Sequence, residues 1–63
     1  MRRILHVVRP GAAPIVADAD WVVYEEGLAW RLDPHGAPPF PAGSIDDAQL
    51  LDLLFAADAV VTW

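Results

Sequence analysis

Residues 44–63 read SIDDAQLLDLLFAADAVVTW, and this stretch decides the fold class. Apolar residues recur at spacings of three and four over residues 44–57, which is the period of an α-helix. We expect Ser44 to cap this helix and Asp47 to stand at its third position, as in a capping box. Residues 59–63 predict a strand after the helix, because the last four of them are β-branched or aromatic. A long helix that leads into a strand is typical of an α/β layer.

The expected helix is apolar nearly all round. One face shows apolar residues at i, i+3 and i+4 spacing, and the other side is apolar as well. A helix of this kind is covered on more than one side, so we expect another subunit to cover part of it. The first face holds Ala48, Leu50, Leu51, Leu54 and Phe55, and the other side holds Ile45, Leu53 and Ala56.

Three earlier segments predict the rest of the sheet. Residues 4–8, ILHVV, form a continuous apolar run that suits a strand covered on both faces. Residues 21–24, WVVY, predict a second strand, and residues 25–27 a turn. Residues 28–32 are either the second strand of a hairpin, an irregular segment or a single helical turn.

Two connections complete the expected architecture. Residues 15–19 are a candidate short helix with Pro14 at its first position. Residues 33–43, DPHGAPPFPAG, form a stiff proline-rich connector, with a polyproline-type ligand as the less favoured alternative. We therefore expect residues 1–63 to form a single small α/β domain. Its sheet has three to four strands, mainly parallel, with one long helix in the C-terminal half.

The composition indicates that the chain has a partner. A chain of 63 residues buries a small core, yet 56% of these residues are hydrophobic. The sequence contains no cysteine, which excludes disulfides and thiolate metal sites, so oligomerisation is the expected source of added stability. Aromatic side chains dominate interface energetics, which makes the expected interface anchors Trp30, Leu53, Phe55 and Trp63. The alternative is that these residues form the core.

The net charge and the lengths of the apolar segments limit which partners and which cellular location we expect. The net charge is −5, with four arginines and no lysine. Nucleic-acid binding relies on contacts from lysine and arginine to phosphate, so we expect no direct nucleic-acid contact. Since no segment reaches the ~18 apolar residues of a membrane helix, we expect no membrane association and a cytoplasmic location.

The sequence shows no catalytic motif. It has no glycine-rich phosphate loop, no Walker motif and no GxSxG. His6 shares a strand face with Ile4 and Val8, and we expect it to be a hydrogen-bonded core or interface residue. Glu25 and Glu26 are neighbours that point to opposite faces of a strand. We expect no enzymatic activity, no cofactor and no metal. The alternative is a small-ligand site at the strand ends that uses His6, Glu25 or Glu26.

The order of these segments resembles a known family. Residues 4–8 resemble the opening strand of the DsrH/TusB family, whose members are small subunits of bacterial sulfur-relay complexes. Residues 20–29 resemble the family's second strand, which ends in an acidic residue and glycine. Residues 45–54 and 58–63 resemble its closing helix and strand. About half of the chain is covered, and the proline-rich connector replaces the family's middle strand-helix unit.

The resemblance implies a reduced flavodoxin-like fold related to DsrE. It also implies assembly with sister subunits, one of which carries a persulfide cysteine. In the tRNA-modifying branch, such a complex passes sulfur toward 2-thiouridine at the wobble position. Because this chain has no cysteine, it cannot carry a persulfide itself. The expected function is a non-catalytic subunit of a DsrE/TusBCD-like complex, and the alternative is a homo-oligomeric interaction module unrelated to sulfur transfer.

Overall fold

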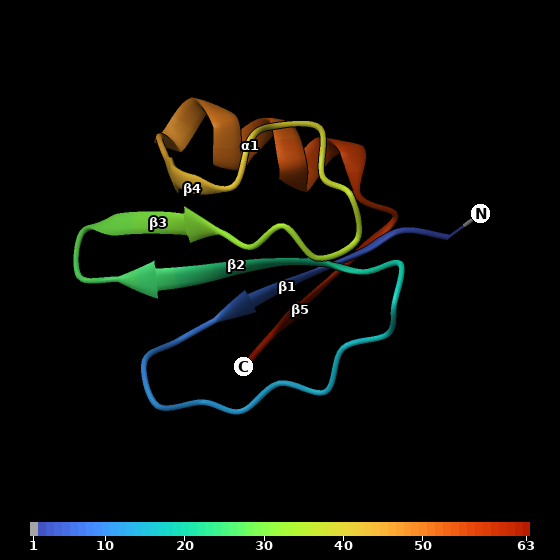
Figure 1. Cartoon of the computed structure of the whole chain (residues 1–63), viewed down its shortest axis with the longest axis horizontal. Helices are drawn as coiled ribbons and strands as arrows, with labels where there is room; N and C mark the ends of the chain where they lie inside the picture. Colours follow the sequence, from blue (N-terminus) through green and yellow to red (C-terminus); the bar gives the residue numbers. More distant parts are fainter. Residues whose placement is uncertain (1) are drawn as a thin grey trace.

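A computed structural model describes residues 2–63 (Figure 1). Within these residues, five strands form one sheet in the order β4-β3-β2-β1-β5. Helix α1 lies at the top of the view, and the segment that joins β1 to β2 runs along the bottom (Figure 1). The elements in chain order are β1 (Ile4–Val8), β2 (Trp21–Glu26), β3 (Ala29–Leu32), β4 (Gly43–Ile45), α1 (Asp47–Ala56) and β5 (Ala59–Thr62).

The sheet is mixed. Strand β1 pairs in parallel with both β2 and β5, whereas β3 pairs antiparallel with β2 and with β4. The α/β class is confirmed, but the expectation of three to four mainly parallel strands was wrong for residues 2–63. A two-residue turn at Gly27 and Leu28 folds β3 back against β2. Gly27 has φ +66, the left-handed geometry that such tight hairpin turns require.

Strand β4 also explains where α1 begins. Ile45 is buried and stands opposite Trp30 of β3, so residues 43–45 belong to the sheet. The helix cap is Asp46, whose carboxylate accepts from the Gln49 amide at 2.8 Å. The side-chain oxygen of Gln49 accepts from the Asp46 amide at 3.0 Å, which completes a capping box. Ser44 is therefore a strand residue, and the expected Ser44 cap was wrong by two positions.

The main core lies between α1 and one face of the sheet. Leu53 has an exposed fraction of 0% and is the one residue of α1 that is fully buried. Phe55 and Leu51 point away from the core, with exposed fractions of 81% and 51%. The expected grouping of the helix residues was thus wrong in part. Leu50 and Leu54 pack against the core together with Leu53, whereas Leu51 and Phe55, which were expected on the same face as Leu50 and Leu54, are exposed. The buried cluster consists of Leu5, Trp21, Val23, Leu32, Ile45 and Leu53.

The opposite face of the sheet is covered by irregular chain. Residues 9–20 join the parallel strands β1 and β2, a connection for which a helix is usual. The expected helix over residues 15–19 does not form; an amide-to-carbonyl bond of 3.0 Å from Asp20 to Ala17 closes a turn instead. A five-residue helix is too short to offset the free energy of nucleation. Proline-rich residues 33–42 form the irregular connection from β3 to β4, as expected.

Gly36 lies in the proline-rich connection between β3 and β4, and it joins this connection to Arg3 and Trp21 by hydrogen bonds. Its carbonyl oxygen accepts from Arg3 Nη1 at 2.9 Å and from Trp21 Nε1 at 3.1 Å. Its φ is +77, and a Cβ at this position would overlap the carbonyl oxygen of Asp20. Backbone atoms cannot move aside as a flexible side chain can, so the chain leaves no room for a side chain here.

We predict that Gly36→Ala lowers the free energy of unfolding more than Gly11→Ala does. Gly11 also has positive φ, +81, but a Cβ there would meet nothing within 4 Å. The control therefore measures the conformational cost alone, about 1–2 kcal/mol. Gly36→Ala adds the overlap with Asp20, and we expect a total loss of about 2–4 kcal/mol. Urea denaturation of the two variants tests this, and equal losses would contradict the close approach.

Candidate functional site

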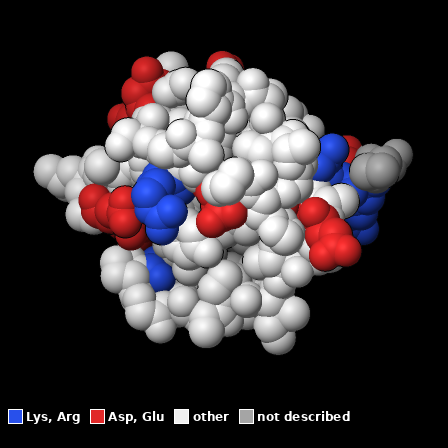
Figure 2. Space-filling view, in the orientation of Figure 1, with Lys and Arg blue, Asp and Glu red and all other residues white. Residues whose placement is uncertain are grey.

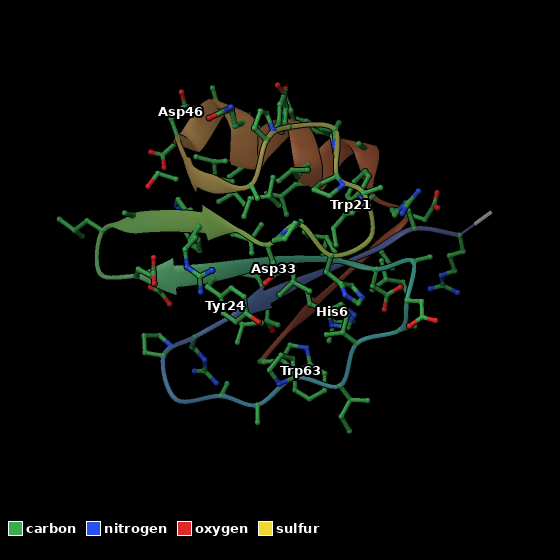
Figure 3. All side chains as sticks on the ribbon, viewed as in Figure 1. His6, Trp21, Tyr24, Asp33, Asp46 and Trp63 are labelled. Carbon is green, nitrogen blue, oxygen red and sulfur yellow. The ribbon has the colours of Figure 1, made fainter. Side chains whose placement is uncertain are left out.

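Three side chains form a hydrogen-bonded chain on the sheet face away from α1. His6 lies at the middle of β1 and Trp63 follows β5 (Figure 3). Asp20 directly precedes β2. The ring nitrogen His6 Nε2 lies 2.7 Å from Asp20 Oδ2. Trp63 Nε1 lies 2.9 Å from His6 Nδ1, and the two rings stack with centroids 6.0 Å apart. Parallel pairing of β1 with both β2 and β5 brings the three residues together.

The donors and acceptors in this chain of three hydrogen-bonded side chains follow from its geometry. An indole nitrogen can only donate, so His6 Nδ1 must accept the Trp63 proton. His6 Nε2 then carries the ring proton and donates it to Asp20. This hydrogen bond lowers the pKa of Asp20 below its ordinary value of 3.8, although burial opposes the shift. The amide of Ala17, which donates to the same carboxylate oxygen at 3.2 Å, lowers the pKa further.

The His6–Asp20 pair has the form of an acid–base dyad, but its free end is occupied. In a hydrolase, the second imidazole nitrogen faces a nucleophile or a substrate proton. Here that nitrogen accepts the indole proton of Trp63, so neither ring nitrogen of His6 is left without a partner. No pocket and no group of three metal-ligating side chains is found among residues 2–63. The arrangement serves to hold β1, residues 17–20 and the end of β5 together.

The acidic pair does not join this site. Glu26 lies at the hairpin end of β2, where its carboxylate is 3.3 Å from Arg31 Nε at the surface. Glu25 is the preceding strand residue and points to the other face of the sheet. The carboxylate that does reach His6 is Asp20, which sequence reasoning did not single out. Its only sequence signal is its position, directly before a buried strand that runs parallel to the strand of His6.

Apolar side chains remain on the surface, as the composition predicts. In the view of Figure 2, charged side chains form a few separate groups and most of the surface is uncharged. Leu51 and Phe55 are one helical turn apart on α1, and together they form an exposed apolar stripe. We call this pair the outer stripe of α1. Among residues 2–63, the exposed large hydrophobic side chains are Ile15, Leu28, Leu51, Phe55, Val60 and Val61.

The four expected anchors occupy different environments. Phe55 is exposed and free to contact a partner, whereas Leu53 is fully buried and reaches no surface. Leu53 thus occupies the core, the alternative that the sequence left open, because its side of the helix packs on the sheet. Trp30 is half-buried against the core, and Trp63 is half-buried on His6. The structure thus does not bring these four side chains to one surface.

Fold and site together define a small mixed α/β protein. Its buried His6 has a hydrogen-bond partner at each ring nitrogen, and its helix carries an exposed apolar stripe. Helix α1, with ten residues, is too short to cross a membrane, and no other described segment forms a helix of that length. Comparisons with protein families, with curated proteins and with solved structures find no match for this chain.

Proposed function

We propose that this protein is a non-catalytic subunit that packs against another protein through the outer stripe of α1. The observation that carries the proposal is the exposure of Phe55, 81%, on a well-formed helix. A large aromatic side chain that stays mostly in water contributes little to folding, whereas buried aromatic side chains dominate interface energetics. The occupied imidazole of His6 supports a role without chemistry.

We further propose that the partner is a cysteine-bearing subunit of a DsrE/TusBCD-like sulfur-relay complex, which in one branch serves wobble 2-thiouridine formation in tRNA. The order of sequence motifs supports this assignment. The parallel part of the sheet, β2-β1-β5, also has its first strand between the second and the last, as in the 2-1-3 part of the flavodoxin-like order. A chain without cysteine suits a supporting place beside a persulfide carrier.

We predict that Phe55→Glu reduces partner binding at least tenfold and leaves the fold unchanged. The change places a charge at one of the two residues of the outer stripe but removes no core contact. Leu28→Glu is the matched control, because Leu28 is an exposed apolar residue at the distant hairpin turn. Affinity capture by each tagged variant, with mass spectrometry of what is bound, measures the effect.

We expect the wild-type chain and Leu28→Glu to recover a DsrE-like, cysteine-bearing protein, and Phe55→Glu to lose it. Recovery of that protein by Phe55→Glu at wild-type levels would show that the outer stripe is not the surface that binds the partner. Failure of all three to recover it would reject the sulfur-relay assignment.

The second candidate function is a homo-oligomeric interaction module unrelated to sulfur transfer. The exposed valines of β5, Val60 and Val61, favour it, because they lie on an edge strand where a second copy can pair. A gene neighbourhood without sulfur-transfer or tRNA-modification genes, combined with a stable homodimer in sedimentation, would favour this candidate over the first.

A further inference from the structure

The two edges of the sheet differ in how open they are. Strand β4 at one edge has three residues, follows Pro41 and leads at once into α1. Strand β5 at the other edge has four residues, AVVT, with neither charge nor proline. Proteins protect edge strands with charges, prolines or very short strands, and β5 has neither of the first two devices. Val60, Val61 and Thr62 are all exposed on it.

The backbone of β5 presents a regular set of free groups. The amide of Trp63 donates to the Val7 carbonyl, and its own carbonyl accepts from the Arg9 amide, so both groups of Trp63 point toward β1. The Ala59 amide also points to β1, where it meets the Arg3 carbonyl at 3.3 Å. Along a strand, the backbone amides and carbonyls of alternate residues point to opposite edges of that strand. The amides and carbonyls of Val60 and Thr62 therefore point outward, where the described chain offers no neighbouring strand.

We propose that β5 pairs antiparallel with β5 of a second copy of this chain, around a two-fold axis at Val61. Outward-pointing residues exchange two hydrogen bonds when they face each other across an antiparallel pair. Val60 then faces Thr62 of the second copy, and Thr62 faces Val60, while Val61 faces itself as a non-hydrogen-bonded pair. The two sheets of five strands become one continuous sheet. This inference rests on the proposed role in subunit packing, and it adds a surface and an occupant.

The side chains and charges of this edge complement themselves under that symmetry. Val61 meets Val61, and Val60 meets Thr62, which are the β-branched cross-strand pairs that stabilise sheets. An antiparallel arrangement also places the start of one strand beside the end of the other. Asp58 at the start thus approaches Arg9 of the second copy, whose Nε is held 2.8 Å from the Trp63 carbonyl at the strand end. A two-fold interface requires such self-complementarity.

A charge swap at Val61 tests the axis directly. Because Val61 faces itself, Val61→Lys and Val61→Asp each place like charges opposite each other. We expect the wild-type chain to dimerise in sedimentation equilibrium, each variant alone to dimerise at least tenfold more weakly, and an equimolar mixture of both to recover dimers. Dimerisation unaffected by either variant, or no dimer of the wild-type chain at millimolar concentration, would overturn the proposal.

Single cysteines give a second readout that does not depend on charge tolerance. The chain lacks cysteine, so Val61→Cys introduces one thiol per copy. The Val61 Cα atoms would lie about 4.5 Å apart, within disulfide range, whereas those of Val60 would lie about 8 Å apart, beyond it. We expect mild oxidation to cross-link Val61→Cys rapidly and the Val60→Cys control at least tenfold more slowly. Equal rates would overturn the register.

These measurements separate the inference from the proposed function. Capture of a cysteine-bearing partner through Phe55 by a chain that stays monomeric would reject the β5 pairing and leave the proposed function standing. A β5 dimer that captures no DsrE-like subunit would do the reverse. Recovery of a different protein that competes for the β5 edge and prevents cross-linking at Val61 would assign that edge to another occupant and overturn the inference.

Discussion

Leu53→Asp is expected to unfold the whole chain. Leu53 has an exposed fraction of 0% and packs among Leu5, Val23 and Leu32 at the centre of the main core. Truncation of such a leucine to alanine costs about 2–5 kcal/mol. An aspartate adds the cost of a buried, unpaired carboxylate. Since a core of this size supplies only about 3–5 kcal/mol of net stability, the substitution exceeds what the fold can tolerate.

Leu51→Asp is the matched control, because it places the same charge on the same helix two residues away. Leu51 is 51% exposed on the outer stripe, and its change removes little buried area. Far-ultraviolet circular dichroism and urea denaturation compare the two variants. We expect Leu51→Asp to stay folded and Leu53→Asp to lose its helix and sheet together. A folded Leu53→Asp that only loses a binding partner would return Leu53 to an interface.

The sequence predicts the elements of this fold better than their packing. The strands β1, β2 and β5 and the helix α1 follow from local periodicity, and the structure confirms them. The inward face of α1 does not follow, because leucines occur on nearly all its sides and the period alone does not select Leu53 over Leu51. The inward position of Leu53 depends on packing against buried residues of the sheet, such as Leu5 and Val23, which are far away in the sequence.

Strand β4 shows a second limit of local reasoning. Residues 43–46 contain two good helix caps, Ser44 and Asp46, within three positions. The structure selects Asp46 because Ile45 is needed opposite Trp30 in the sheet. Long-range pairing with β3 therefore overrides the earlier cap, a competition that no local pattern reveals.

Three side chains, His6, Asp20 and Trp63, form the buried hydrogen-bonded chain, and the sequence predicted the role of only His6. A histidine within an apolar strand needs hydrogen-bond partners, so a bonded core position for His6 could be expected and is confirmed. Its partners lie 14 and 57 residues away in the sequence. Parallel pairing of β1 with β2 and β5 sets these contacts, so Asp20 and Trp63 became visible only with the strand order. Trp63 was expected at an interface or in the core, and its indole proton is donated to His6 within the chain.

Asp20→Ala is expected to lower the free energy of unfolding by about 1–3 kcal/mol. The substitution leaves the Nε2 proton of buried His6 without an acceptor, which incurs the desolvation cost of an unpaired donor. Asp20→Asn is the matched variant, because its amide oxygen can still accept from His6 in nearly the same volume. Urea denaturation at pH 7 measures both, and we expect Asp20→Asn to retain most of the stability that Asp20→Ala loses. Equal losses would contradict the hydrogen-bonding role.

The same pair of variants predicts how stability changes with pH. The hydrogen bond from His6 holds the pKa of Asp20 below its ordinary value of 3.8, so the folded chain favours the ionised carboxylate more than the unfolded chain does. A lowered native pKa stabilises the fold above pH 3.8, and that contribution is lost as the pH falls through the native value. Asp20→Asn has no proton to bind. The stability advantage of wild type over Asp20→Asn should therefore hold at pH 5–7 and shrink steadily below pH 3.8 in urea titrations. An advantage that grows on acidification would mean that burial, rather than His6, controls this carboxyl group.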